Sequence, residues 1–282
     1  MVVTYYKNQF CPSGSSQVPV EERGFNFGDG VYEVVRYFRQ RGIGLDEHLQ
    51  RLVESAEGIR LRLPYPPDEL RTIMAQAVAK VPGDWVDVYM QVTRGEAPRR
   101  QPFPNAEPIL AMVAKQAPLV SAAQRQAGVG AIFHPDERWL NCNLKTLNLL
   151  PNCLAKQAAL DAGAFEAILV RDGRVTEGST SNVFAVIDGI IRTAPADRFI
   201  LNGITRRLVI QAAQSLGLEV RQEAFTPEML TTRATEVFIT STTNDLLPIS
   251  YLDGQALPIA SMGPVTEKLL QAFRMLTEIA DE

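Results

Sequence analysis

The sequence is poor in the groups that usually build metal centres and disulfide frameworks. It contains three cysteines, Cys11, Cys142 and Cys153, and two histidines, His48 and His134. The cysteines are odd in number and lack metal-ligand spacing, so we expect free thiols in a reducing compartment and no metal site. We expect His48 to be a structural residue within a helix and His134 to lie in a loop.

Long apolar runs and a large charge excess are also missing. No stretch approaches the ~20 apolar residues that span a bilayer, and the first residues lack the pattern of a signal peptide. The formal net charge of −4 gives no general attraction to nucleic acid or to anionic membranes. A hydrophobic content of 46% in 282 residues instead predicts a folded protein. We therefore expect a cytoplasmic enzyme that acts on small molecules, with neither nucleic acid nor membrane as partner.

Strand and helix patterns alternate along the first part of the chain. β-branched and aromatic residues predict strands at residues 2–10, 30–38, 87–95 and 107–117. Helical spacing of apolar residues predicts helices at 46–59 and 68–81, opened by Asp46 and Asp68. A short polar stretch at residues 118–126 breaks the pattern and is interpreted as a domain linker.

The second part of the chain repeats this alternation. Strands are expected at residues 127–133, 166–173 and 235–243, and helices at 148–163, 204–217 and 264–280. Asp188-Gly189 predicts the turn of a hairpin within residues 181–194. The patterns together predict an α+β fold of two domains, residues 1–117 and 127–282, with a ligand in the cleft between them.

Lysine is scarce, and one of the six lysines, Lys145, lies in an apolar stretch of the sequence. Most lysines in such a setting extend to solvent. An apolar environment also favours the neutral amine, which is the form that attacks an aldehyde. Lys145 is therefore a candidate nucleophile.

A carboxylate and a helix start follow Lys145 along the chain. Glu177 lies in VTEGSTSNVF, where the ordinary alternative is a carboxylate in a turn. Gly203-Ile204-Thr205 opens a helical pattern, and free N–H groups at such a start bind phosphate. An amine, an anion beside a ring nitrogen and a phosphate site are the groups that pyridoxal phosphate needs. The anion favours a protonated ring, so the set points to chemistry with a stabilised carbanion, such as transamination.

The chain resembles the fold-type IV pyridoxal-phosphate enzymes, and among them most closely the D-amino acid aminotransferases. The matching stretches occur in order over nearly the full length: FNFGDGVYEVVR, DEHLQRL, QVTRGEAPR, RWLNCNLKTLNLLPN, AFEAILVRDGRVTEGSTSNVF, ILNGITR and VFITSTTNDLLP. The resemblance implies a two-domain fold whose C-terminal domain binds pyridoxal 5′-phosphate. It also implies a homodimer in which residues of one subunit complete the site of the other.

The resemblance further assigns roles to residues of this chain. Lys145 resembles the Schiff-base lysine, which also moves the proton between Cα and C4′. Glu177 resembles the partner of the ring nitrogen, and Leu201 the side chain that packs on the ring. The phosphate ligands implied are Arg51, Ile204, Thr205 and Thr242.

The residues that match the substrate positions depart from the usual pattern. Tyr32 and Arg99 correspond to positions that hold the α-carboxylate of a D-amino acid. The family reads Arg-x-His, whereas this chain has Arg99-Arg100-Gln101, and Gln101 donates hydrogen bonds but carries no charge. Arg100 either compensates or meets a second carboxylate, as on D-glutamate or 2-oxoglutarate. From residue type alone, Arg99 is equally a solvated loop arginine.

The expected activity is therefore the transfer of amino groups between D-amino acids, of the D-alanine or D-glutamate type, and 2-oxo acids. Alternatives are a branched-chain L-amino acid transaminase, an (R)-amine transaminase and an aminodeoxychorismate-type lyase. A protein that only binds the cofactor is a further alternative, but Lys145 and Glu177 argue against it, because mere binding needs no electron sink.

Overall fold

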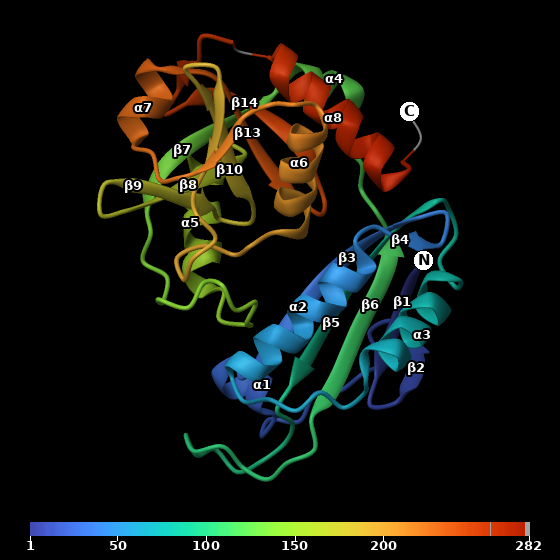
Figure 1. Ribbon diagram of the computed structural model, residues 1–282. Helices are drawn as coiled ribbons and strands as arrows, with labels where there is room; N and C mark the ends of the chain where they lie inside the picture. Colours follow the sequence, from blue (N-terminus) through green and yellow to red (C-terminus); the bar gives the residue numbers. More distant parts are fainter. Residues whose placement is uncertain (260, 280–282) are drawn as a thin grey trace. The chain divides into compact units, whose positions relative to one another are not determined.

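The computed structural model describes residues 1–259 and 261–279. Within these residues the chain forms eight helices and fifteen strands, which divide into two compact units (Figure 1). Unit 1 contains Met1–Pro118 and Leu144–Asn148, and unit 2 contains Leu119–Asn143 and the described residues from Leu149 onward. Helices together with one antiparallel and one mixed sheet confirm the predicted α+β class.

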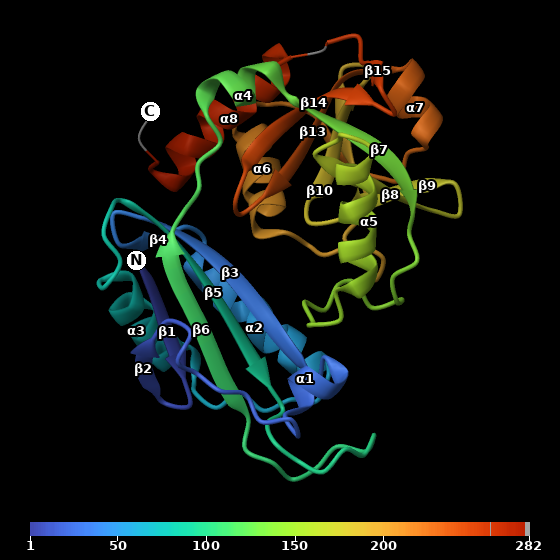
Figure 2. The same cartoon turned by 180° about the vertical axis from the view of Figure 1, so that it is seen from behind.

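Unit 1 is built on an antiparallel sheet of six strands in the order β2-β1-β6-β5-β3-β4. Its strands are β1 (Val2–Tyr6), β2 (Gln9–Pro12), β3 (Gly30–Phe38), β4 (Arg41–Gly42), β5 (Trp85–Thr93) and β6 (Ile109–Gln116). Its helices are α1 (Arg23–Phe27), α2 (Leu45–Gly58) and α3 (Pro67–Val78). Helices α2 and α3 cover the same face of the sheet in both views (Figures 1 and 2).

The core of unit 1 lies between this face and the two helices. Leu49 and Leu52 of α2 are buried with Val31 and Val35 of β3 in one apolar cluster. The helical spacing on one side and the alternate positions on the strand meet in this cluster, as the sequence periodicity requires.

The segment Leu144–Asn148 adds to the edge of β3 in unit 1. The Tyr32 N–H donates to the Lys145 carbonyl at 3.0 Å, and the Leu147 N–H donates to the Gly30 carbonyl at 3.0 Å. Val31 and Thr146 form an antiparallel bridge between these bonds. The lysine segment therefore groups with unit 1, although the predicted C-terminal domain, residues 127–282, includes it.

Unit 2 contains a mixed sheet of nine strands in the order β12-β11-β10-β13-β14-β7-β8-β9, with β15 paired to β14. Its strands are β7 (Val129–Pro135), β8 (Glu166–Arg171), β9 (Arg174–Gly178), β10 (Asn182–Ile187), β11 (Ile190–Thr193), β12 (Val220–Gln222), β13 (Ala234–Ser241), β14 (Asp245–Leu252) and β15 (Gln255–Ala256). Its helices are α4 (Ala122–Ala127), α5 (Leu150–Asp161), α6 (Ile204–Ser215), α7 (Pro227–Thr232) and α8 (Pro264–Thr277). The pairs β14–β7, β7–β8 and β11–β12 are parallel.

Helices of unit 2 pack on different parts of this sheet. Helix α5 packs on β7 and β8 through small residues such as Ala155 and Ala159 (Figure 2). Helix α6 packs against α8 and β13. Phe184 of β10 and Phe238 of β13 are paired in register, and their rings stack with centroids 5.0 Å apart. These contacts fix the strands that carry the candidate site residues of this unit.

Several predicted elements differ from the structure. The single strand expected at residues 2–10 is a hairpin, because Lys7 and Asn8 take positive φ values of 46° and 69° and turn the chain. Asp46 lies in the first turn of α2 and is not its N-cap. Its negative charge interacts favourably with the positive end of the helix dipole. Asp68 lies in the first turn of α3 in the same way. His134, expected in a loop, belongs to strand β7.

Of three further predictions, one is confirmed, one overlaps a helix and one lies partly outside the described residues. The hairpin turn at Asp188-Gly189 is present, with φ values of 55° and 77°. The predicted linker at 118–126 includes most of helix α4, which Ser121 caps by accepting a hydrogen bond from the Gln124 N–H at 3.1 Å. The last helix was expected to reach residue 280, which is outside the described residues. Residues 1–259 and 261–279 contain no helix that is both long and apolar enough to cross a bilayer.

Candidate active site

Lys145 lies in unit 1, opposite Tyr32 on the edge of the sheet. Its N–H donates to Ser55 Oγ of helix α2 at 3.0 Å, which anchors the backbone. The antiparallel pairing puts both side chains on one face, and Lys145 Nζ lies 4.2 Å from the centroid of the Tyr32 ring. Among the residues that the structure describes, Lys145 has no ion pair with a carboxylate. The half-buried amine therefore rests on an aromatic ring.

Three buried polar residues of unit 1 lie on the opposite face of β3. Arg51 of α2 forms a bidentate pair with Glu33, with distances of 2.7 Å from Nε and 2.9 Å from Nη2. His48 Nδ1 lies 2.7 Å from the same carboxylate. Burial raises the pKa of Glu33, but Arg51 and His48 outweigh it and hold this pKa well below its ordinary value. Glu33 therefore fixes the direction of the Arg51 guanidinium.

The sequence did not single out Glu33, because this residue alternates with apolar residues along β3 and fits an ordinary strand pattern. His48 has the structural place that was expected for it. Burial lowers the pKa of His48, so the neutral ring donates its Nδ1–H to Glu33. The available signal was a carboxylate at a strand position between Val31 and Val35, on the same face as these apolar residues and shortly before the helix that carries the candidate ligand Arg51.

The candidate substrate residues of unit 1 fall into two groups. Tyr32 lies beside Lys145, whereas Arg99, Arg100 and Gln101 are exposed on the loop between β5 and β6. Arg23 shapes this loop by donating to the carbonyls of Arg100, at 2.5 Å, and Gln101, at 3.3 Å. Within the described chain, Tyr32 makes no hydrogen bond or ring contact with these three residues.

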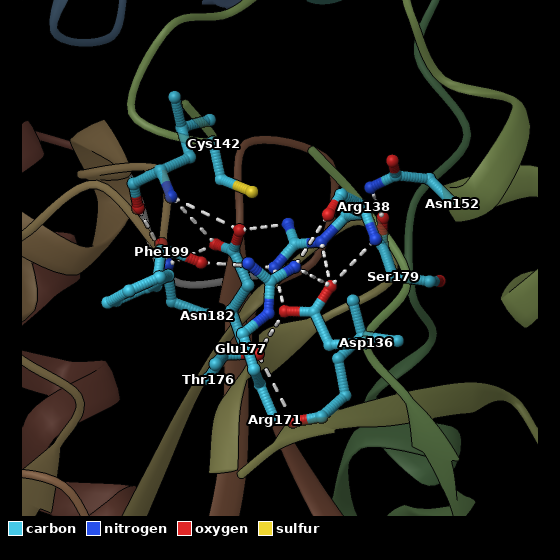
Figure 3. Close-up of polar contacts among 12 residues, drawn as sticks. Asp136, Arg138, Cys142, Asn152, Arg171, Thr176, Glu177, Ser179, Asn182 and Phe199 are labelled. Carbon is cyan, nitrogen blue, oxygen red and sulfur yellow. Dashed lines mark hydrogen bonds and ion pairs between the residues drawn. The ribbon is translucent and has the colours of Figure 1, made fainter. Parts of the chain in front are cut away.

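Glu177 lies in unit 2, on strand β9 and not in the turn that its neighbours suggested. Arg138 Nη1 donates to its Oε1, and Asn182 Nδ2 donates to its Oε2 at 2.9 Å (Figure 3). The N–H of Leu201 is shared between the two oxygens, at 3.1 Å from each. A buried carboxylate thus has a charged donor and two neutral donors around it.

A second set of polar residues surrounds Arg138. Its Nε and Nη2 donate to Asp136 at 2.8 and 2.9 Å (Figure 3). Asp136 also accepts hydrogen bonds from Arg171 at 3.0 Å and from Thr176 at 2.9 Å. Burial raises the pKa of Asp136, but the hydrogen bonds from Arg138 outweigh it, so the net effect is a lowered pKa. Asp136 and Arg138 were not singled out in the sequence, although Arg138 opens the stretch RWLNCNLKTLNLLPN and Asp136 lies two residues before it.

A tight turn brings Asn182 back to Glu177. Glu166 accepts hydroxyl hydrogen bonds from Ser179, from Thr180 at 3.2 Å and from Ser181 at 2.8 Å. A Cβ atom on Gly178 would lie 2.2 Å from Ser181 Oγ, so a larger residue there would displace the Ser181 hydroxyl from its present position. The Ser/Thr-rich segment is thus an internal support for the carboxylate, held by one buried glutamate.

The predicted phosphate ligands of unit 2 lie on either side of Asn182. Ile204 and Thr205 begin helix α6, whose N-cap, Gly203, offers no side-chain hydrogen bond. A Cβ on Gly203 would lie 2.2 Å from Asn182 Oδ1, which places the helix start against this residue. Asn182 is also paired in register with Thr240, two residues before Thr242 in the turn after β13.

These groups have the chemistry that pyridoxal phosphate requires. The helix start presents N–H donors that no side chain caps. Within the described part of the chain, the Thr240 hydroxyl is buried without a hydrogen-bond partner, beside the hydroxyl-rich turn that contains Thr242. Glu177 is a buried carboxylate, the type of group that suits a protonated ring nitrogen. The residues therefore fit a phosphate ester and a protonated heteroaromatic ring.

Comparison with known proteins agrees with this chemistry. The sequence model of the family described as amino-transferase class IV matches residues 30–252. The D-alanine aminotransferase of Listeria monocytogenes serotype 1/2a (strain 10403S) is 42% identical over 269 residues, which cover 94% of this chain and 93% of the relative.

Solved structures give the same result for the fold. The branched-chain amino acid aminotransferase of Escherichia coli has a TM-score of 0.89 at 25% identity, with 98% of this chain and 94% of that chain covered. The branched-chain amino acid aminotransferase of T.th., solved with pyridoxamine 5′-phosphate, has a TM-score of 0.88 at 27% identity, with 98% and 93% covered.

Proposed function

Because the chain belongs to the class IV aminotransferase family, we propose that it transfers amino groups between D-amino acids and 2-oxo acids with pyridoxal 5′-phosphate as cofactor. The choice of D-amino acids rests on the D-alanine aminotransferase that is 42% identical over 94% of this chain. The observation that carries the chemistry is the buried Glu177 carboxylate with its charged partner. When bound, the cofactor supplies an aldehyde for an amine and a ring that accepts electrons from the substrate Cα.

Lys145 would supply the amine that holds the aldehyde, and after the substrate amine has displaced it, the freed amine would carry the proton between the substrate Cα and C4′. Its backbone is anchored by Ser55 and paired with β3, so only the side chain has to move between these tasks. The amine lies against the Tyr32 ring, and among the described residues it has no carboxylate partner. A free amine beside an aromatic ring suits a group that must act as both nucleophile and base.

Glu177 holds a proton at the ring nitrogen of the cofactor. Asn182 and the Leu201 N–H fix the plane of the carboxylate by donating to its oxygens. A proton held at that nitrogen makes the ring a better acceptor of the electrons left at Cα. Leu201 packs its side chain on the ring face.

The phosphate is bound by the N–H groups of Ile204 and Thr205 and by Thr242. Arg51 adds a positive charge, and its pair with Glu33 fixes the direction of the guanidinium. Fixed donors bind an anion without the entropy cost of ordering them first.

The substrate α-carboxylate is bound by Tyr32 with Arg99, Arg100 and Gln101. Because these three loop residues are exposed and make no hydrogen bond or ring contact with Tyr32 within the described chain, we assign them to the site of a second subunit in a homodimer. The dimer is also supported by helix α5, which exposes Leu150 and Leu154, one turn apart. Light scattering of the Leu150→Glu/Leu154→Glu variant tests this: the mass should fall to one chain.

A branched-chain L-amino acid transaminase is the second candidate, because the solved structures of that activity resemble this chain with TM-scores of 0.89 and 0.88. The enantiomer of the substrate separates the two. We place the reaction in the cytoplasm, which the three free cysteines support.

Two measurements test the proposed function. Borohydride reduction of the holoenzyme followed by peptide mapping should label Lys145 and should label nothing in Lys145→Ala. Mixing the holoenzyme with single D- or L-amino acids or (R)-amines should deplete the bound-aldehyde absorbance fastest with D-alanine or D-glutamate. A label at another residue would remove the assigned nucleophile, and faster depletion by L-leucine or L-valine would favour the branched-chain activity.

A further inference from the structure

Arg138 joins two buried carboxylates within unit 2 (Figure 3). It donates through Nε and Nη2 to Asp136, at 2.8 and 2.9 Å, and through Nη1 to Glu177. The side chain of Arg138 is 8% exposed, that of Asp136 is 0% exposed and that of Glu177 is 6% exposed. Water therefore screens these charges little, and the attraction between each pair of opposite charges is stronger than it would be at the protein surface.

Asp136 holds the guanidinium of Arg138 in place and is itself held by other donors. Arg171 donates to Asp136 at 3.0 Å and to the Arg138 carbonyl at 2.8 Å. Thr176, the residue before Glu177 on β9, donates to Asp136 at 2.9 Å. Arg138 also donates to the Phe199 carbonyl at 3.1 Å. Every rotation of Arg138 away from Glu177 would break several of these bonds.

Glu177 needs a cation in this environment. Burial raises the pKa of its carboxyl, and Arg138 acts in the opposite direction. Asp136 carries a charge of the same sign as Glu177. Electrostatic interactions with Glu177 also involve Arg206 and the Cys142 thiol. Among the described residues, Arg138 is the cation that hydrogen-bonds to the carboxylate. Without it, the neutral acid would be strongly favoured.

We propose that Arg138 is a positioning residue for the proton that Glu177 and the cofactor ring nitrogen share. It determines whether this proton resides on the carboxylate or on the nitrogen. The inference rests on the proposed function of Glu177. A guanidinium beside the carboxylate makes Glu177 a weaker base, which leaves the proton on the ring nitrogen. Asp136 keeps the guanidinium aimed at Glu177, and Arg171 offsets the charge of Asp136. Arg138 acts through Glu177 and does not touch the reacting atoms.

Infrared spectroscopy of the full chain freed of cofactor tests this directly. The band of a protonated carboxyl is assigned to Glu177 by its loss in Glu177→Gln. We expect no such band in the native sequence at pH 7 and a clear band in Arg138→Met at the same pH. Arg138→Lys, which keeps a positive charge, should lack most of it. A Glu177 acid band in the native sequence at pH 7, or none in folded Arg138→Met, would overturn the proposal.

Arg171→Met is the matched control. It removes a second buried arginine from the same cluster, but Arg171 contacts Asp136 and makes no hydrogen bond to Glu177. It should lower the thermal midpoint like Arg138→Met while leaving Glu177 ionised at pH 7. An equal acid band in both arginine variants would mean that general loosening of the cluster, not the Arg138 charge, protonates Glu177. If Arg138→Met does not fold, Arg138→Gln keeps a hydrogen-bond donor without the charge and is measured in the same way.

The holoenzyme gives a second measurement. The pH at which the infrared acid band of Glu177 reaches half its height should rise in Arg138→Met. For each pH unit of this rise, kcat should fall by about tenfold, because one unit changes the distribution of the proton between the two groups tenfold. KM should stay within about twofold, since Arg138 is not assigned to substrate binding. A change confined to KM would contradict the proposal. Borohydride labelling of the native sequence separates the two claims: an unlabelled Lys145 would overturn the proposed function while the infrared result stands.

Discussion

Asn182 Nδ2 lies 2.9 Å from Glu177 Oε2, and the same amide group donates to the Leu201 carbonyl at 2.8 Å. One side chain thus ties together the end of strand β9, the start of strand β10 and the segment that leads into helix α6. The hydroxyl-rich turn on Glu166 makes this contact possible by reversing the chain within four residues.

Replacing Asn182 with alanine should weaken both the fold and the cofactor site. A hydrogen bond to a buried charged group contributes about 2 kcal/mol, so the free energy of unfolding in urea should fall by roughly that amount. The affinity for pyridoxal 5′-phosphate should fall as well. Asn152→Ala is the control, because Asn152 donates to the Ser179 carbonyl of the same turn at 2.8 Å but does not contact Glu177. Equal losses of cofactor affinity in both variants would contradict the role of Asn182.

Gly203→Ala should disturb the start of helix α6. The new Cβ would lie 2.2 Å from Asn182 Oδ1, and Asn182 has little freedom because Glu177 and Leu201 hold it. Overpacking of this kind costs about 1–3 kcal/mol, and the phosphate site should bind its anion more weakly. In Gly130→Ala the Cβ meets its neighbours at 3.8 Å or more, an ordinary contact. An unchanged thermal midpoint and an unchanged phosphate affinity in Gly203→Ala would show that the close approach of Gly203 to Asn182 does not restrict the residue at position 203.

Glu33→Gln should lower stability in a pH-dependent way. The variant leaves Arg51 buried without its carboxylate, which costs about 3 kcal/mol at neutral pH. Because the pKa of Glu33 is lowered in the folded protein, its contribution is present above the ordinary value of 4.5 and is lost as the pH falls through the folded value. The difference in unfolding free energy between the native sequence and the variant should therefore shrink on acidification.

The matched control for Glu33→Gln is Asp87→Asn in the same sheet. Asp87 forms a bidentate pair with Arg36, at 2.8 and 3.0 Å, between β3 and β5. Both variants break a buried ion pair, but only Glu33→Gln releases Arg51, so only it should weaken the binding of pyridoxal 5′-phosphate. A similar loss of binding in Asp87→Asn would assign the effect to the stability of unit 1 as a whole.

Cys142 should resist alkylation in the folded protein. Burial raises the pKa of its thiol to about 11, and the thiol donates to the Trp139 carbonyl at 3.1 Å. Because the thiolate is the reactive form, iodoacetamide at pH 8 should label Cys142 about 100-fold more slowly in the native protein than in urea. Mass spectrometry of the labelled peptides measures both rates. Equal rates would show that the thiol is neither buried nor shifted.

Local patterns in the sequence predicted the regular elements well. β-branched and aromatic residues indicated β3 and β5, helical spacing indicated α2 and α6, and Asp188-Gly189 indicated the β10–β11 turn. Each of these signals depends on neighbours within one element. Strand β9, which carries Glu177, was not predicted. It has five residues, begins with an arginine and ends with a glycine, so apolar and polar residues alternate too little to indicate a strand.

The partners of the candidate residues were beyond reach of the sequence because they depend on strand register. Arg138 and Glu177 are 39 positions apart, and their contact requires β7, β8 and β9 to be neighbours in the sheet. Glu33 and Arg51 are 18 positions apart and meet only because α2 covers β3. Residue chemistry singled out Lys145, Glu177 and the start of α6. Family resemblance assigned their roles and added Arg51, Leu201 and Thr242, and those roles stay predictions until they are tested by the experiments above.

The pairing of Leu144–Asn148 with β3 has a consequence for dividing this chain into fragments. A truncation after Pro118 would remove the short segment and leave the Tyr32 N–H and the Gly30 carbonyl open on a sheet edge, where unpaired groups promote aggregation. A fragment from Leu119 onward would carry Lys145 on a stretch without its strand partner. A cut at the boundary of the two units therefore separates β3 from its edge partner, and two pieces restore this pairing only if the later piece binds its lysine segment to β3 of the earlier one.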